Sequence, residues 1–156
     1  MQAGPVKTTV VVWLTAVLLG SACTSIEHSA SPSAPVIDLT GTWRGDFTVQ
    51  GLTSEMVWTL TQTGTSVSGP VLVHLPNGIV LLNGFLTGTL AGSTLTYTIS
   101  VGPQGIPNQP ACVGQLSGTM TAQTGATSSL TGTYAVTSST CTPPFASSGN
   151  LALTRG

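Results

Sequence analysis

Charged side chains are scarce in this sequence. Asp, Glu, Lys and Arg make up 4% of its 156 residues, the formal net charge is −1, and none of the four occurs between Glu55 and Arg155. Binding to nucleic acid, or to anionic lipid headgroups through charge, requires clustered Lys and Arg. The composition therefore argues against a nucleic-acid partner. Because 40% of the residues are hydrophobic and the net charge is near zero, the chain is expected to fold.

Groups able to carry out catalysis are also few. After Glu55, His74 is the only side chain that titrates near neutrality, and it is expected in a hairpin. Acid–base and nucleophilic catalysis need titratable groups held within reach of one another. Asp46 and Glu55 are candidate carboxylates, but Arg44 beside them favours a surface ion pair. The sequence therefore indicates no enzyme and no cofactor, and its isolated cysteines provide too few ligands for a metal site.

The sequence has no apolar run long enough to span a membrane comfortably. Lys7 precedes an apolar segment at residues 10–19, which suits the hydrophobic region of a signal peptide. Residues 19–23 (LGSAC) resemble a bacterial lipobox, in which the chain is cleaved before a Cys that then carries lipid. Residues 1–22 are therefore predicted to be a signal peptide, and Cys23 to anchor the exported protein to a membrane of the bacterial cell envelope. The alternative is an ordinary secretory signal cut near Ala22, which would leave Cys23 as a free thiol.

Residues 23–37 have the composition of a linker. After Cys23 the segment is mostly Ser, Ala and Pro with a few polar residues, which is typical of a flexible tether. A coil of about fourteen residues would hold the following domain roughly 20 Å from the lipid surface. Residues 38–156 are then predicted to be one folded domain.

The folded domain repeats a short motif with the period of a β-strand. The motif is an apolar residue, then Ser, Thr or Asn, then Gly, any residue and an apolar residue. It occurs at residues 39–43, 67–71, 82–86, 86–90, 116–120 and 130–134. At period two, the apolar residues and the Gly share one face of a strand. Inward glycines let strands bend sharply, as a small closed barrel requires.

Alternation and turn residues predict eight strands. Their expected positions are about residues 39–50, 55–62, 66–75, 78–90, 94–101, 114–123, 128–138 and 147–155. An even number of strands with short connections favours an all-β fold, an eight-stranded up-and-down antiparallel β-barrel. A β-sandwich is the alternative. In the barrel, tight turns near Gly64, Gly92 and Gly125 lie at one end and longer loops at the other.

The two cysteines of the folded domain flank the sixth and seventh predicted strands. Cys112 and Cys141 would therefore both lie at the looped end of the barrel. An exported compartment permits disulfides, so the two residues are predicted to be bonded to each other. A bond closing a loop of this size is expected to stabilise the fold by about 3–4 kcal/mol.

Gly41-Thr42-Trp43, at the start of the first predicted strand, resembles the G-x-W signature of lipocalins and their calycin relatives. In that superfamily an Arg near the end of the last strand packs across the Trp at the closed end of the barrel. The resemblance implies that Arg155, which ends the eighth predicted strand, stacks on Trp43 through a cation–π interaction of about 1–2 kcal/mol. The role that it implies for this pair is structural.

Two functions remain open at this point. If the inward glycines leave room, the barrel binds a small apolar ligand in a cavity lined by Trp58, Tyr97, Met120 and Tyr134. Alternatively, the barrel is filled by its own side chains, and the protein is a structural or protein-interaction component of the envelope, for example a protease inhibitor. An apolar cavity of about 300 Å³ or more would distinguish the ligand-binding barrel from the filled one.

Overall fold

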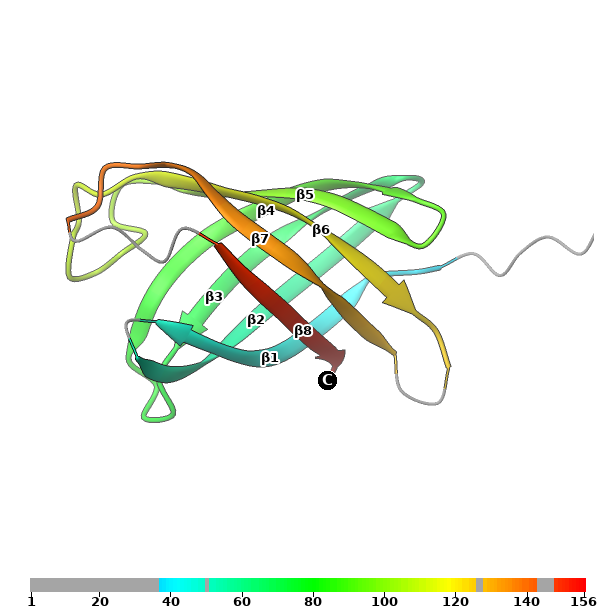
Figure 1. Ribbon diagram of the computed structural model, residues 1–156, viewed down its shortest axis with the longest axis horizontal. Coiled ribbons are helices and arrows are strands. Elements are labelled where there is room, and N and C mark those ends of the chain that lie inside the picture. The colour runs from blue at the N-terminus through cyan, green and yellow to red at the C-terminus, as the bar shows by residue number, and fades with distance from the viewer. Residues whose placement is uncertain (1–36, 50, 126–127, 143–147) are drawn as a thin grey trace, which may run out of the picture. The chain divides into compact units, whose positions relative to one another are not determined.

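The computed structural model describes residues 37–49, 51–125, 128–142 and 148–156 of the chain. The predicted signal peptide, Cys23 and the tether up to residue 36 lie outside the described residues. The strands are β1 (Gly41–Val49), β2 (Leu52–Thr63), β3 (Ser66–His74), β4 (Val80–Ala91), β5 (Thr94–Val101), β6 (Gly114–Gln123), β7 (Ser129–Ser139) and β8 (Ser148–Arg155). Each strand pairs with the next, all pairs are antiparallel, and β8 returns to β1 (Figure 1). The predicted eight-stranded up-and-down barrel is confirmed, and the sandwich is excluded.

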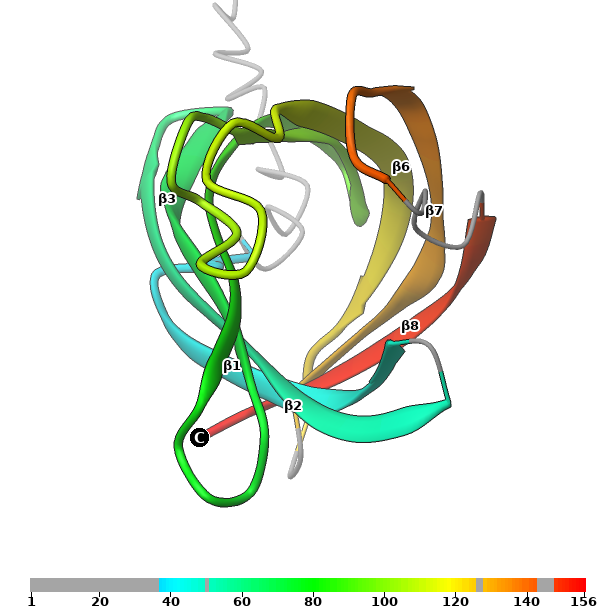
Figure 2. The same ribbon diagram turned by 90° about the vertical axis from the view of Figure 1, so that its left-hand side faces the viewer.

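The two ends of the barrel differ in their connections. At the closed end the strands are joined by tight turns, two of which place Gly64 and Gly92 at φ of 59° and 60°, values that favour glycine. At the other end, called the mouth below, lie the loop 75–79 between β3 and β4 and the loop 102–113 between β5 and β6. Figure 2 shows the barrel from the mouth. None of the described residues forms a helix that could span a membrane.

The interior of the barrel is packed with apolar and aromatic side chains. They come from every second residue of each strand, as the period-two pattern predicted; in β5, for example, Leu95, Tyr97, Ile99 and Val101 are buried and the residues between them are not. The largest side chains with almost no exposure are those of Trp43, Trp58, Leu60, Leu86, Leu95, Tyr97, Ile99, Met120, Leu130 and Leu153. Close packing of this kind leaves few voids larger than a water molecule.

The inward glycines seat the two tyrosines of the core. Tyr97 of β5 lies opposite Gly88 of β4 and Gly118 of β6, and Tyr134 of β7 lies opposite Gly118 and Gly149 of β8. A Cβ atom placed on Gly149 would lie 2.7 Å from a ring carbon of Tyr134, and one placed on Gly118 would lie 3.0 Å from the Tyr97 hydroxyl. These glycines therefore make room for aromatic rings rather than for a ligand.

The seam between β1 and β8 is the shortest of the eight. Among the described residues, β1 pairs with β8 only through Trp43 opposite Arg155 and Arg44 opposite Thr154. Every other neighbouring pair of strands is joined through most of its length. The two ribbons lie side by side near the C-terminus and separate toward the mouth in both views (Figures 1 and 2). The barrel is thus closed firmly at one end and only loosely at the other.

Candidate functional site

The closed end is sealed by the residues that the calycin resemblance singled out. The Cζ atom of Arg155 lies 4.9 Å from the centroid of the Trp43 ring, so the stack that the resemblance implied is present. The indole Nε1 of Trp43 donates to the backbone oxygen of Leu39 at 2.8 Å, and the Arg155 guanidinium donates to the backbone oxygen of Asp38. Arg155 therefore binds the segment before β1 as well as the ring.

Gln62, near the end of β2, fixes the same segment from the other side. Its side-chain amide donates to the backbone oxygen of Ile37 at 3.1 Å, and its amide oxygen accepts from the backbone N–H of Leu39 at 2.9 Å. Hydrogen bonds from Thr40 hold the pKa of the Asp38 carboxyl below its ordinary value. The Leu39 side chain is also buried, so the described residues at this end hold the segment before β1 against the barrel.

A small apolar cavity lies just inside the mouth. Its volume is about 40 Å³. The residues around it include Phe47, Leu82, Val101, Ile106, Leu116, Tyr134, Val136 and Cys141. Such a space is enough for one or two water molecules, whereas sites for drug-sized ligands begin at roughly 300 Å³. The part of the interior that the structure describes is therefore filled by the chain's own side chains.

The four residues predicted to line a ligand cavity fall into two groups. Trp58 and Met120 are 0% exposed and Tyr97 is 2% exposed, and these three form core contacts away from the mouth cavity. The Tyr97 hydroxyl donates to the backbone oxygen of Thr133 at 3.2 Å, and its ring meets the Trp58 ring edge-on at a centroid distance of 5.1 Å. Burial raises the pKa of the Tyr97 hydroxyl. Only Tyr134 of the four borders the cavity.

Trp58 carries one unusual feature. Its indole Nε1 is buried and has no hydrogen-bond partner among the described residues. A buried donor without a partner costs about 1–3 kcal/mol. Among the described residues, Tyr97 is the only aromatic residue whose ring packs against Trp58, and the two rings meet edge-on. Contact with an aromatic ring compensates an unpaired N–H only weakly.

Cys112 and Cys141 come together at the mouth. Their Cα atoms are 4.8 Å apart, within the range of disulfide-bonded pairs. The adjoining backbone is paired as well, because the N–H of Thr140 donates to the oxygen of Val113 at 3.0 Å and the N–H of Val113 donates to the Thr140 hydroxyl at 3.0 Å. The pairing that the strand order predicted is therefore present, and it ties the long β5–β6 loop to the end of β7.

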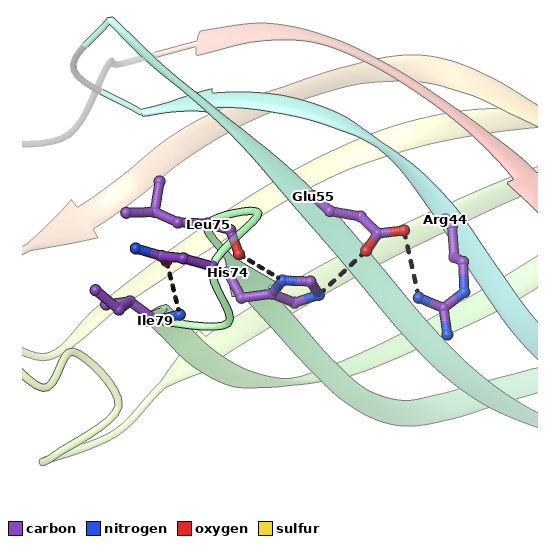
Figure 3. A network of polar contacts seen from close by, with 6 residues as sticks. Arg44, Glu55, His74, Leu75 and Ile79 are labelled. Carbon is purple, nitrogen blue, oxygen red and sulfur yellow. Dashed lines mark hydrogen bonds and ion pairs between the residues drawn. The ribbon is translucent and has the colours of Figure 1, made fainter.

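A chain of polar contacts crosses the outer face of β1, β2 and β3 (Figure 3). Glu55 lies between two partners, with Arg44 Nη1 at 3.3 Å from one carboxylate oxygen and His74 Nε2 at 3.2 Å from the other. The Nδ1 atom of His74 lies 3.1 Å from the backbone oxygen of Leu75. The ion pair of Arg44 was expected. His74, expected in a hairpin, is the last residue of β3 and lies directly opposite Glu55, where its side chain is partly buried.

These groups do not form a catalytic or metal-binding constellation. All of them lie on the outside of the barrel, and no reactive hydroxyl or thiol is in contact with His74 or Glu55 among the described residues. The described part of the chain also contains no group of three His, Cys, Asp or Glu residues that could hold a metal ion. Asp46 lies opposite Glu55 in the β1–β2 register and has no ion pair within the described residues.

The outer face of β6, β7 and β8 carries an open groove that the sequence reasoning missed. Its volume is about 620 Å³. It is lined by Ser117, Gly118, Thr119, Thr133, Tyr134, Ala135, Ser148, Gly149 and Asn150. Two rows of small, mostly polar side chains form its walls, and the Gly118–Tyr134–Gly149 row forms its floor. The run of Ser and Thr at outward positions was visible in the sequence, but the register that places Gly118 and Gly149 beside Tyr134 was not.

The site residues thus lie in three regions of the barrel: the closed end, the filled interior, and the mouth, which has both polar and apolar residues around it. The calycin resemblance stays a prediction, since it depends on Gly41, Trp43, Arg155 and the number of strands. A comparison with known proteins finds neither a family model nor a curated protein that matches this chain.

Proposed function

We propose that this protein is an exported lipoprotein of a bacterial cell envelope, held at a membrane through Cys23, whose barrel acts as a protein-interaction module. The observation that carries the proposal is the filled interior, in which the cavity just inside the mouth measures about 40 Å³. Eight-stranded barrels either enclose one small ligand or are filled by side chains. A filled barrel must act through its outer surface and its loops.

The distribution of charge supports this role for the outer surface. Arg44, Asp46, Glu55 and His74 lie on β1 to β3, whereas the outward positions of β4 to β8 are mostly Thr and Ser until Arg155. A surface of this kind offers hydrogen bonds without strong long-range attraction. Partners would then be selected by shape and by hydrogen bonding, with little dependence on salt.

The anchor can be tested by fractionation of cells that produce the full chain. Cys23→Ala should move the protein from the membrane fraction to the soluble exported fraction, because no lipid can be attached. Ser21→Ala, which keeps a small residue before Cys23, is the matched control and should stay with the membrane. Unchanged membrane association of the Cys23→Ala protein would refute the anchor.

A second candidate function, binding of a small apolar molecule at the mouth, is favoured by one observation. The mouth cavity is bordered mainly by apolar side chains, among them Leu82, Val101 and Ile106. Titration with an apolar fluorescent dye separates the two functions. The interaction module should show no saturable binding, whereas a carrier should bind the dye and lose it in Ile106→Trp, which fills the cavity, but not in the exposed-site control Thr96→Trp.

A further inference from the structure

The seam between β1 and β8 leaves backbone groups without a strand partner. Gly156 donates from its backbone N–H to the oxygen of Thr42 at 2.9 Å, so Thr42 directs its backbone groups toward β8. In an antiparallel pair these groups alternate between the two sides of a strand. Arg44 therefore also faces β8, as its pairing with Thr154 shows, and so do the next alternate residues, Asp46 and Thr48.

The same alternation applies to β8. Arg155 donates from its backbone N–H to Ser128 on the β7 side, so the even-numbered residues of β8 face β1. Beyond Thr154 these are Ala152, Asn150 and Ser148. The backbone oxygen of Ala152 lies against Gly45 of β1, so the two strands are still in contact there. Asn150 and Ser148 have no strand partner on that side among the described residues. The seam thus opens beyond Asp46 and Ala152, at Thr48 of β1 and at Asn150 and Ser148 of β8, whose N–H and C=O groups point at it. Unpaired edges of this kind are templates for another strand.

We propose that the open part of this seam receives an extended peptide segment of a partner protein, which adds to β8 as a ninth strand. The proposal deepens the interaction role proposed above and depends on it. The occupant follows from the chemistry of the edge, because a row of backbone donors and acceptors is matched by an extended backbone. Antiparallel addition to β8 uses both of its free residues, Asn150 and Ser148.

The surroundings of the seam specify the side chains of the segment. On the inner side lie Phe47 and Tyr134, whose ring centroids are 5.5 Å apart, and both border the mouth cavity. Every second residue of the added strand would meet this apolar surface. On the outer side lie the exposed Asp46 and the groove wall formed by Ser148 and Asn150. The outward residues should therefore be small and polar, with one Lys or Arg placed to pair with Asp46.

The first test measures amide hydrogen exchange in the full chain, kept in solution with a mild detergent. The gap-facing amides of Thr48 and Asn150 should exchange at least about 100-fold faster than amides in the complete β4–β5 and β5–β6 ladders, such as that of Thr96. Equal protection in a monomer would mean that the seam is closed, and this would overturn the proposal. Protection that appears only as the chain dimerises would assign the edge to a second copy and would also overturn it.

The second test uses the peptide acetyl-TVKVTVT-amide as a probe of the same protein. The peptide should bind saturably, protect the amides of Ser148 and Asn150 and leave that of Thr96 unchanged. Asn150→Pro removes a gap-facing N–H without removing one from the β7–β8 ladder, so it should weaken binding about tenfold or more. Asn150→Ala keeps this N–H and should bind within about twofold of the wild type. Equal binding by the two variants would refute the added strand.

Two modified peptides keep the test decisive if Asn150→Pro does not fold. N-methylation of the peptide amides that would face β8 should abolish binding, and Glu in place of the Lys should weaken it at low salt. Binding that survives N-methylation would refute strand addition. A protein that partitions with the membrane through Cys23 and excludes apolar dye, yet does not bind the unmodified peptide, would refute this inference and leave the proposed function standing.

Discussion

Replacing each of the two most buried tryptophans with Phe should have very different effects on stability. Trp43 and Trp58 are 1% and 0% exposed, and the change from indole to phenyl removes the same atoms at both positions. The cost of the lost contacts is therefore similar. What differs is the indole N–H, which donates to Leu39 in Trp43 and has no partner among the described residues in Trp58.

The magnitudes follow from these two environments. Trp43→Phe leaves the buried backbone oxygen of Leu39 without its donor, at about 1–3 kcal/mol, and weakens the stack with Arg155, which at an exposed site contributes about 0.5–1 kcal/mol. Trp58→Phe instead removes an unpaired buried donor and recovers about 1–3 kcal/mol of desolvation cost. The free energy of unfolding should therefore be lower in Trp43→Phe than in Trp58→Phe by about 2–7 kcal/mol.

Urea denaturation followed by circular dichroism, with the disulfide intact, measures this difference. The two variants should show the same slope against urea and different midpoints, since both keep the fold. Equal midpoints, or a lower midpoint for Trp58→Phe, would refute the reasoning. That result would mean either that the Trp58 N–H is satisfied in solution or that the Trp43 hydrogen bond contributes nothing.

Three further predictions concern the rest of the barrel. Replacing Cys112 and Cys141 together with Ser should lower the free energy of unfolding by about 3–4 kcal/mol, as the entropy of the loop between them suggests, and reductant should have no effect on the double variant in the same urea assay. Burial raises the pKa of Tyr97, so the folded state keeps the phenol proton at a pH where the unfolded state loses it. The free energy of unfolding should therefore fall above about pH 10. Tyr97→Phe should flatten this decline in urea midpoints measured from pH 8 to 11. Gly118→Ala would drive its Cβ into a backbone oxygen and should cost about 3 kcal/mol or prevent folding, whereas Gly125→Ala meets nothing within 4 Å and should be nearly neutral in thermal unfolding.

Local signals in the sequence predicted the strands well. β5 and β6 have the predicted bounds, 94–101 and 114–123, because alternation and the flanking turn residues are properties of neighbours in the chain. The disulfide could be predicted for a related reason: once the strand order was set, Cys112 and Cys141 had to lie at the same end.

Features that depend on register could not be predicted in the same way. The contact of Glu55 with His74 needs the offset between β2 and β3, which no local pattern contains. Whether Tyr97 lines a cavity or fills it depends on which glycines lie opposite, and this is again a matter of register. The ladder between β1 and β8 is short because of the way the whole sheet closes. Non-local geometry of this kind decides the site, so the sequence supported the fold more strongly than the function.

The placement of tyrosines over glycines also bears on how this repetitive chain selects one register while it folds. The repeated motif makes neighbouring strands so alike that a slip of two residues preserves the inward and outward faces. A slip of two between β4 and β5, however, would place Tyr97 opposite Leu86 or Leu90 in place of Gly88, where the ring has no room. Each tyrosine therefore favours the one strand register in which glycines lie opposite its ring. A barrel without these tyrosines would keep its alternation of apolar and polar residues and its apolar core, but its strands would pair in several competing registers.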